Sequence, residues 1–249
     1  MSSRVYDLPT RVFHWLFAGS FITAFTISNT IDDENLAFSY HMIFGLIMVF
    51  SVVIRIIWGL FGSKHAKFSD FSLNLKNLVS YLKGILSGTN RKWVGHNPAS
   101  SWAAVIMMIL ALGLGVSGVL MIKGVAGEVL EEVHELLANT FLVVVIVHIA
   151  GVIIHQSKHK DSIAMSMVTG FKQDLPETTE SVSRHLGVGL LFLFLTVGFS
   201  AYLIQNFDSS SRTLSIFGSQ LQLYENEGDD FDGYKHGESE EHEEREEHD

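Results

Sequence analysis

The chain has 249 residues, enough for one large or two small soluble domains, yet its apolar residues gather in long runs. Cysteine is absent, which excludes disulfides, cysteine-attached haem, cysteine-ligated zinc and iron–sulfur clusters. The formal net charge of −10 arises in segment 207–249, which holds 14 of the 27 acidic residues and three basic ones. The remainder carries about +1 and forms no basic groove, so we expect no nucleic-acid partner.

Five apolar runs follow one another along the chain. They cover residues 12–31, 36–61, 100–122, 130–156 and 186–206. Each is long enough to span a bilayer, which takes about 20 apolar residues in a helix. We therefore predict an all-α membrane protein with five transmembrane helices, surrounded by membrane lipid. Residues 68–86 are amphipathic, which suits a helix in the membrane interface.

The links between the runs predict the orientation, because Lys and Arg collect on the cytoplasmic side of membrane proteins. Two arginines precede the first run, and the links 62–99 and 157–185 are rich in basic residues. The links 32–35 and 123–129 share a single lysine. We therefore expect a cytoplasmic N-terminus and a C-terminal tail outside the cytoplasm, in a periplasm.

Four histidines lie in these runs at matching depths: His14, His41, His134 and His148. Fourteen residues separate His134 from His148, so both lie on one helix face about 21 Å apart along the axis. The orientation puts His41 and His134 near the periplasmic surface, and His14 and His148 near the cytoplasmic surface. Two neutral imidazoles complete the coordination of haem iron, which then has six ligands. Such an iron has no open position, so it exchanges electrons and does not bind small ligands. The pattern predicts a four-helix, di-haem b cytochrome with one haem on each pair.

The same histidines allow a plainer interpretation, in which they only hydrogen-bond between helices. Matching depths and the high cost of a titratable group inside a membrane favour ligation. Arg11 and Arg55 lie on the cytoplasmic side and are candidate partners of haem propionates. For Arg55, snorkelling to lipid headgroups is the alternative. We expect His155 at the membrane interface, and His65 and His185 in solvated links.

Seven short segments carry a resemblance to a known family. They are Tyr6–Trp15, His41–Gly45, Arg55–Gly59, Gly95–Pro98, His134–Glu135, His148–Gly151 and Met167–Gly170. In these segments the chain resembles the bacterial cytochrome b-561 and Ni,Fe-hydrogenase b-type cytochrome family, with the gamma subunit of membrane formate dehydrogenase as a more distant relative. The resemblance implies a bundle of four helices with two b haems. Four histidines stand at the family's ligand positions: His14, His41, His134 and His148.

The resemblance also implies a quinone site beside the cytoplasmic haem, bordered by His96 and Asn97 near His148. A plainer interpretation of Gly95–Pro98 is a cap followed by a helix start, which needs no quinone.

The chain departs from the family near residue 175, so we expect three parts. They are a di-haem four-helix domain at 1–175, a fifth transmembrane helix at 176–207 and a periplasmic acidic tail at 208–249. The tail from Glu225 has the composition of a disordered segment, whereas 208–224 has enough apolar residues to dock on another surface. An acidic tail attracts a lysine-rich partner, which favours a periplasmic c-type cytochrome over a hydrogenase.

The sequence thus predicts a membrane cytochrome that carries electrons between the quinone pool and a periplasmic redox partner. It leaves open whether the chain is an enzyme in its own right or one subunit of a complex. Superoxide:quinone oxidoreductase activity, or transport, on the same scaffold is one alternative. A haem-free membrane anchor is another, and a metal permease is a third that would need ligands converging at one midplane site.

Overall fold

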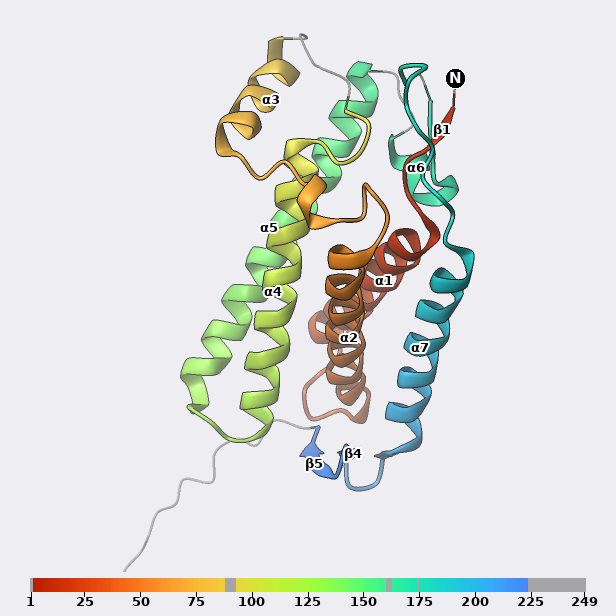
Figure 1. Ribbon diagram of the computed structural model, residues 1–249. Coiled ribbons are helices and arrows are strands. Elements are labelled where there is room, and N and C mark those ends of the chain that lie inside the picture. Colours follow the sequence, from red (N-terminus) through yellow and green to blue (C-terminus); the bar gives the residue numbers. More distant parts are fainter. Residues whose placement is uncertain (1, 88–92, 160–162, 174, 224–249) are drawn as a thin grey trace, which may run out of the picture.

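The computed structural model describes residues 2–87, 93–159, 163–173 and 175–223. Over these residues the protein is mostly helical, and its long helices run between two opposite ends of the molecule (Figure 1). The α-helices are α1 (Leu8–Thr30), α2 (Ser39–Phe61), α3 (Leu75–Ser87), α4 (Pro98–Ile122), α5 (Gly127–His159), α6 (Ile163–Thr169) and α7 (Leu186–Gln205). Two 3₁₀ turns, η1 (Leu36–Phe38) and η2 (Phe68–Asp70), lie in the links.

Four helical segments in the described part of the chain are long and apolar enough to cross a membrane. They are Leu36–Phe61, Pro98–Ile122, Gly127–Lys158 and Leu186–Gln205. Helix α1 has 23 residues, yet it falls outside this set because Arg11, His14 and several Ser and Thr residues lower its apolarity. The protein is therefore a multi-pass membrane protein, and a span by α1 stays a prediction.

The helices pack in an order that follows the chain. Helix α1 packs on α2 and α7, α2 packs on α4, and α4 packs on α5. Local sequence fixes two of the helix starts. Asp7 caps α1 by accepting a 2.9 Å hydrogen bond from the amide of Thr10, and Asn97 caps α4 by accepting one of 2.8 Å from the amide of Ser100. Proline follows both caps, where its fixed backbone angle suits a first turn.

Phe141 lies at the centre of the core and is 1% exposed. It stands on α5 midway between His134 and His148, seven residues from each. Its ring lies 4.3 Å from that of Phe21 and 5.8 Å from that of Phe17, measured between ring centres, so it joins α5 to α1. These aromatic rings fill the middle of the bundle and separate the two histidine pairs.

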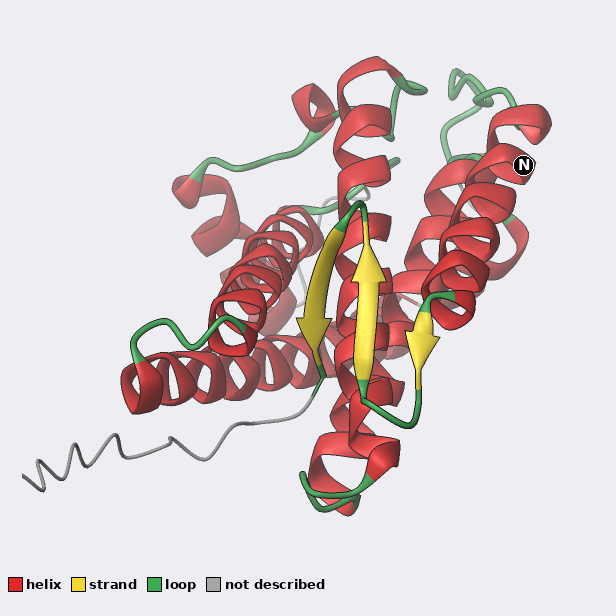
Figure 2. Ribbon diagram, turned by 90° about the horizontal axis from the view of Figure 1, so that it is seen from below, coloured by secondary structure: helices red, strands yellow, loops and turns green. Residues whose placement is uncertain are grey.

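Two small antiparallel sheets lie at opposite ends of the bundle. Strands β1 (Ser3–Arg4) and β2 (Phe171–Lys172) form one, and β3 (Phe207–Asp208), β4 (Thr213–Ile216) and β5 (Ser219–Gln222) form the other. The second sheet lies across the end of the helices in Figure 2. We call the end with β4 and β5 the hairpin end, and the opposite end, with α3 and β1, the α3 end.

The second sheet is a departure from the all-α fold class that the sequence predicts for the protein. Its turn uses Phe217 and Gly218, both with positive φ, as a two-residue hairpin of the mirror-image type requires. Leu214 and Leu221 point under the sheet and pack with Leu203 and with Ile43 of α2. The apolar segment therefore docks on the bundle, as expected, but it does so as strands. The predicted disordered tail from Glu225 lies outside the described residues.

Candidate functional site

His41 on α2 and His134 on α5 lie side by side at the hairpin end. Their ring centres are 6.2 Å apart and both rings are half-buried. Two imidazoles on one metal ion have ring centres roughly 6 Å apart, given metal–nitrogen bonds of about 2 Å and about 1 Å from nitrogen to ring centre. The separation therefore suits one shared iron between the two rings.

In both rings, a hydrogen bond at Nδ1 determines which of the two ring nitrogens can bind a metal. His41 Nδ1 lies 2.9 Å from the carbonyl oxygen of Ala24, which can only accept, so Nδ1 carries the proton. His134 Nδ1 lies 2.8 Å from Ser117 Oγ, whose own hydroxyl donates to the carbonyl of Leu114, so Nδ1 again donates. Each ring then has a free lone pair on Nε2, the tautomer that metal-binding histidines keep through such bonds.

The two supporting bonds repeat the same relation in two helical hairpins. Ala24 and Ser117 each precede their histidine by 17 residues and lie on the preceding long helix. Helices α1–α2 and α4–α5 thus each present one histidine from the second helix of a pair. Sequence reasoning found both histidines but missed Ser117, because a buried serine in an apolar run carries no pattern of its own.

A narrow apolar cleft of about 70 Å³ separates the two histidines from the phenylalanines of α1. Small residues line it: Ala24, Gly45, Gly115 and Ala138. A Cβ at Gly45 would meet nothing within 4 Å, so the cleft is open at this residue. The cleft is smaller than a typical cofactor pocket of roughly 300 Å³ or more. The donor atoms therefore fit a bis-imidazole iron, while the helices must part further to admit a porphyrin.

His14 on α1 and His148 on α5 form the second pair, at the α3 end. Both rings are half-buried, and they are close enough to interact electrostatically. His14 Nδ1 is buried and has no hydrogen-bond partner among the described residues, unlike Nδ1 of His41 and His134. No three His, Cys, Asp or Glu side chains converge on one point in the described parts of the chain, so the histidines occur as pairs.

Two arginines lie toward the same end of the bundle as this second pair. Arg55 is only 3% exposed; its Nη2 donates a 2.8 Å hydrogen bond to the carbonyl of Ala66, and its buried Nη1 has no partner in the described structure. Phenylalanine rings surround the guanidinium, with Phe68 at 5.1 Å from its carbon. Arg11 donates to the carbonyl of Val168, while its Nε is buried and unpaired among the described atoms. The burial of Arg55 argues against snorkelling into the headgroups.

A buried polar cluster extends from Arg55 to the loops of the α3 end. His96 is buried next to Tyr6 and Phe71, and it interacts electrostatically with Arg55. Burial, reinforced by that cation, lowers the pKa of His96 to about 3, so its ring is neutral at physiological pH. Its Nδ1 has no hydrogen-bond partner within the described chain. Asn97 does not join this cluster through its side chain, which serves as the cap of α4.

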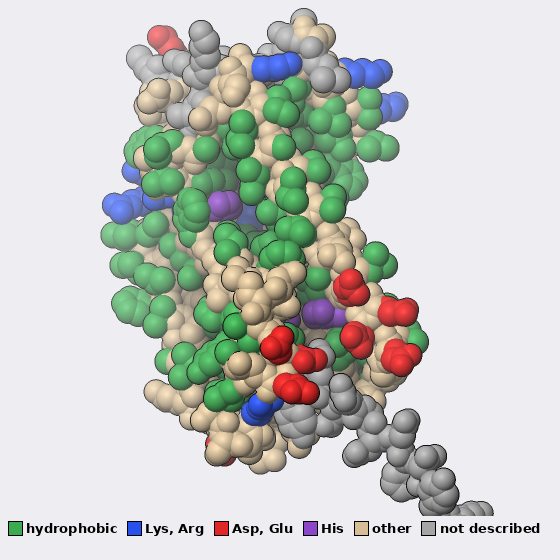
Figure 3. Space-filling model, turned by 180° about the vertical axis from the view of Figure 1, so that it is seen from behind, with side chains coloured by type: hydrophobic (Ala, Val, Ile, Leu, Met, Phe, Trp, Pro, Cys, Tyr) green, Lys and Arg blue, Asp and Glu red, His purple; other side chains and the backbone are tan. Residues whose placement is uncertain are grey.

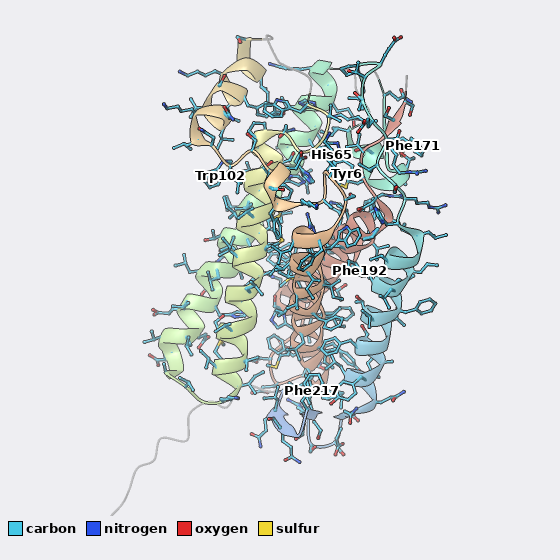
Figure 4. The ribbon with its side chains drawn as sticks, in the orientation of Figure 1. Tyr6, His65, Trp102, Phe171, Phe192 and Phe217 are labelled. Atoms are coloured by element: carbon cyan, nitrogen blue, oxygen red, sulfur yellow. The ribbon has the colours of Figure 1, made fainter. Side chains whose placement is uncertain are left out.

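Three histidines in or near the links differ from expectation. His65 is buried, not solvated, because its Nδ1 pairs with Asp70 Oδ2 at 2.8 Å. His155 is 4% exposed and its Nδ1 lies 2.8 Å from the hydroxyl of Tyr81, so it faces protein and not the interface. His185 is half-buried against Trp58. Figure 4 shows His65 beside Tyr6 at the α3 end, opposite Phe217 at the hairpin end.

Acidic side chains gather at the hairpin end. Figure 3 shows them on the back of the molecule, beside the lower of two visible histidine positions. The exposed members in the described chain are Asp32, Asp33, Glu34, Glu128, Glu131, Glu132, Glu135 and Asp208. Sequence reasoning attributed the negative charge of the protein to the tail alone. The structure shows that these carboxylates add negative charge at the end of the bundle that holds His134.

The family model of prokaryotic cytochrome b561 matches residues 5–170, about two thirds of the chain, and its limits enclose both histidine pairs. No curated protein and no solved structure gives a significant match.

Proposed function

The chain belongs to the prokaryotic cytochrome b561 family, and on that basis we propose that it is a di-haem cytochrome of a bacterial inner membrane. It carries electrons between the quinone pool and a periplasmic redox partner. The family and the apolar helices support the coarser statement, a membrane b-type cytochrome for electron transfer. The number of haems, the ligands and the partners are the proposal.

One observation carries the ligand assignment. The rings of His41 and His134 come from different helices, lie 6.2 Å apart, and both keep Nε2 free because Nδ1 is hydrogen-bonded. A bis-histidine iron site needs two imidazoles from different helices at about this separation, each held in the tautomer that leaves Nε2 for the metal. His14 and His148 are assigned to the second haem on different grounds, namely that the two rings from α1 and α5 lie close enough to interact and that Nδ1 of His14 is buried without a partner among the described residues.

The residues around the two histidine pairs orient the imidazole rings, supply positive charge to the haem propionates and separate the two sites. Bound haem supplies one-electron chemistry at iron. Ser117 and the carbonyl of Ala24 hold the rings of His134 and His41 in the ligating tautomer. Arg55 and Arg11 offer unpaired guanidinium nitrogens to anionic propionate groups at the α3 end. Phe141 keeps the two sites apart and excludes water between them.

The two ends of the bundle then serve two partners. At the α3 end, which we assign to the cytoplasmic side, neutral His96 and the unpaired Nη1 of Arg55 border the region where a quinone would meet the second haem. Asn97 contributes there as a helix cap that fixes the start of α4. At the hairpin end, exposed carboxylates suit a basic partner such as a c-type cytochrome, because complementary charge speeds encounter.

A spectrum of the full-length protein in detergent tests this proposal. We expect two b haems per chain, with low-spin bands in the reduced-minus-oxidised difference spectrum and no band from an open iron position. A colourless protein would support a haem-free anchor. One haem per chain would remove the second histidine pair from the ligand set. Superoxide oxidation by the isolated protein, without any partner, would move the function to a superoxide:quinone oxidoreductase.

A further inference from the structure

Helix α3 stands beside the bundle at the α3 end and is attached to it by polar bonds. The hydroxyl of Tyr81 lies 2.8 Å from Nδ1 of His155, and both side chains are buried. Lys158 of α5 also donates a hydrogen bond to the carbonyl of Ile85. These contacts fix α3 to the last turns of α5, the helix that carries His134 and His148. The position of α3 is therefore set by the fold and does not depend on its apolar face.

The outward apolar face of α3 is uncovered. Leu75, Val79 and Leu82 repeat at helical spacing and are 63%, 43% and 47% exposed. Tyr81 is buried toward the bundle. An amphipathic helix with an exposed apolar stripe at the end of a membrane bundle lies in the interface, where that stripe enters the acyl region.

A hollow of about 680 Å³ lies along the border of this apolar stripe. The residues that line it are Leu75, Lys76, Val79, Ser80, Lys83, Gly84 and Ser87. On a helical projection at 100° per residue, Lys76 and Lys83 occupy the middle of this set. Apolar side chains lie on one side of the two lysines, and serine hydroxyls and a glycine lie on the other. The lysines are two turns apart, about 10 Å along the axis.

We propose that this hollow binds the headgroup of an anionic phospholipid. The two ammonium groups and the hydroxyl of Ser80 match a phosphate, and the exposed apolar stripe matches the acyl chains of the lipid. Helix α3 contains no acidic residue, and the carboxylate of Asp70, in the preceding link, is paired with His65. The charge of the hollow therefore selects a lipid with net negative charge over a zwitterionic one.

The test compares lipids bound to the purified full-length protein. The protein is exchanged from detergent into bilayer discs of phosphatidylcholine with a minor fraction of phosphatidylglycerol, and the retained lipids are counted by native mass spectrometry. We expect wild type to retain phosphatidylglycerol selectively. The double variant Lys76→Gln/Lys83→Gln should bind it about thirty-fold more weakly, because each lysine near an anionic lipid contributes about a factor of five.

The pair Lys64→Gln/Lys67→Gln is the matched control, since it removes the same charge from a loop at the same end. The control should retain phosphatidylglycerol as wild type does, and haem content should be equal in all three proteins. Equal retention by wild type and the α3 variant would overturn the proposal. So would equal retention of phosphatidylcholine, or displacement of the lipid by excess inorganic phosphate. Because haem is counted in the same samples, failure of the lipid site is distinguishable from failure of the cytochrome function.

Discussion

At the hairpin end both histidine rings are fixed by hydrogen bonds from neighbouring helices, whereas at the α3 end His14 keeps an unpaired nitrogen. The surroundings differ as well. The hairpin end presents exposed carboxylates, and the α3 end buries the cations Arg55 and Lys172. One fold thus places two histidine pairs in surroundings of opposite charge. Buried cations stabilise added negative charge, so we expect the α3-end haem to have the higher reduction potential if ligation is equal.

Removing one ligand at each end should give the largest effect. His41→Ala and His14→Ala should each reduce haem from two per chain to one, because a single imidazole leaves the iron without its second protein ligand. Haem quantified per chain and redox titration check this, and the haem lost should be the low-potential one for His41 and the high-potential one for His14.

His185→Ala is the control, since His185 lies outside both pairs and should keep two haems. Two haems in either ligand variant would contradict the assignment of that end.

The next largest effect should come from losing the hydrogen bond between His134 Nδ1 and the hydroxyl of Ser117 at the hairpin end. Ser117→Ala removes the acceptor of the His134 Nδ1 proton, and loss of such an outer partner typically weakens metal binding about 10–100-fold. The rate at which apo-myoglobin extracts haem from the protein measures this change. Ser51→Ala is a matched control, because Ser51 is equally buried but bonds only to the carbonyl of Ile47 in its own helix. A Ser117 variant that holds haem as tightly as the Ser51 variant would remove this support.

Removing the charge of Arg55 should change the reduction potential of the α3-end haem without changing the haem content. Arg55→Gln removes a buried positive charge, and an electrostatic interaction of roughly 2 kcal/mol corresponds to roughly 90 mV for one electron. The potential of the α3-end haem should fall, because reduction adds negative charge that the cation stabilises. The hairpin-end haem should stay unchanged, and Arg55→Lys should largely restore the potential. An equal fall at both ends would point to a general structural effect.

The sequence predicted the spans of four helices and the pairing of histidines by depth, since both depend on regular spacing along single helices. It could not predict Ser117 or the carbonyl of Ala24 as partners, because those contacts form between helices. The small sheet was also missed. Leu214 and Ile216 show the alternation of a strand, but the run is short and its turn, Phe217–Gly218, lacks the usual Asn-Gly signal.

His65 was assigned to solvent for a similar reason. Its partner Asp70 lies five residues away in the same link, a spacing that no regular element brings together. Gly95 backs directly onto this pair, where a Cβ would come within 3 Å of both side chains. Contacts that form through irregular loops have no regular spacing in the sequence, so the sequence alone does not predict them. The polar cluster of the α3 end consists mostly of such contacts.

The smallest effect we predict is a pH dependence of stability that comes from this cluster. His96 faces Arg55 on α2, His65 and Asp70 in the link before α3, and Lys172 on β2, and its pKa is lowered to about 3 by burial and then by Arg55. An unfolded histidine titrates near 6.5, so between the two values the unfolded chain binds a proton that the folded chain does not. Stability is therefore full above about pH 6.5 and falls as the pH drops toward 3.

At pH 5 this difference costs on the order of 2 kcal/mol. Thermal unfolding in detergent at pH 7.5 and at pH 5 should show a smaller loss for His96→Gln than for wild type, because glutamine does not titrate. His185→Gln, at a half-buried position outside the cluster, should retain the wild-type loss. If His96→Gln and wild type lose the same stability on acidification, the ring is not held neutral by this cluster, and the α3 end owes its pH response to other groups.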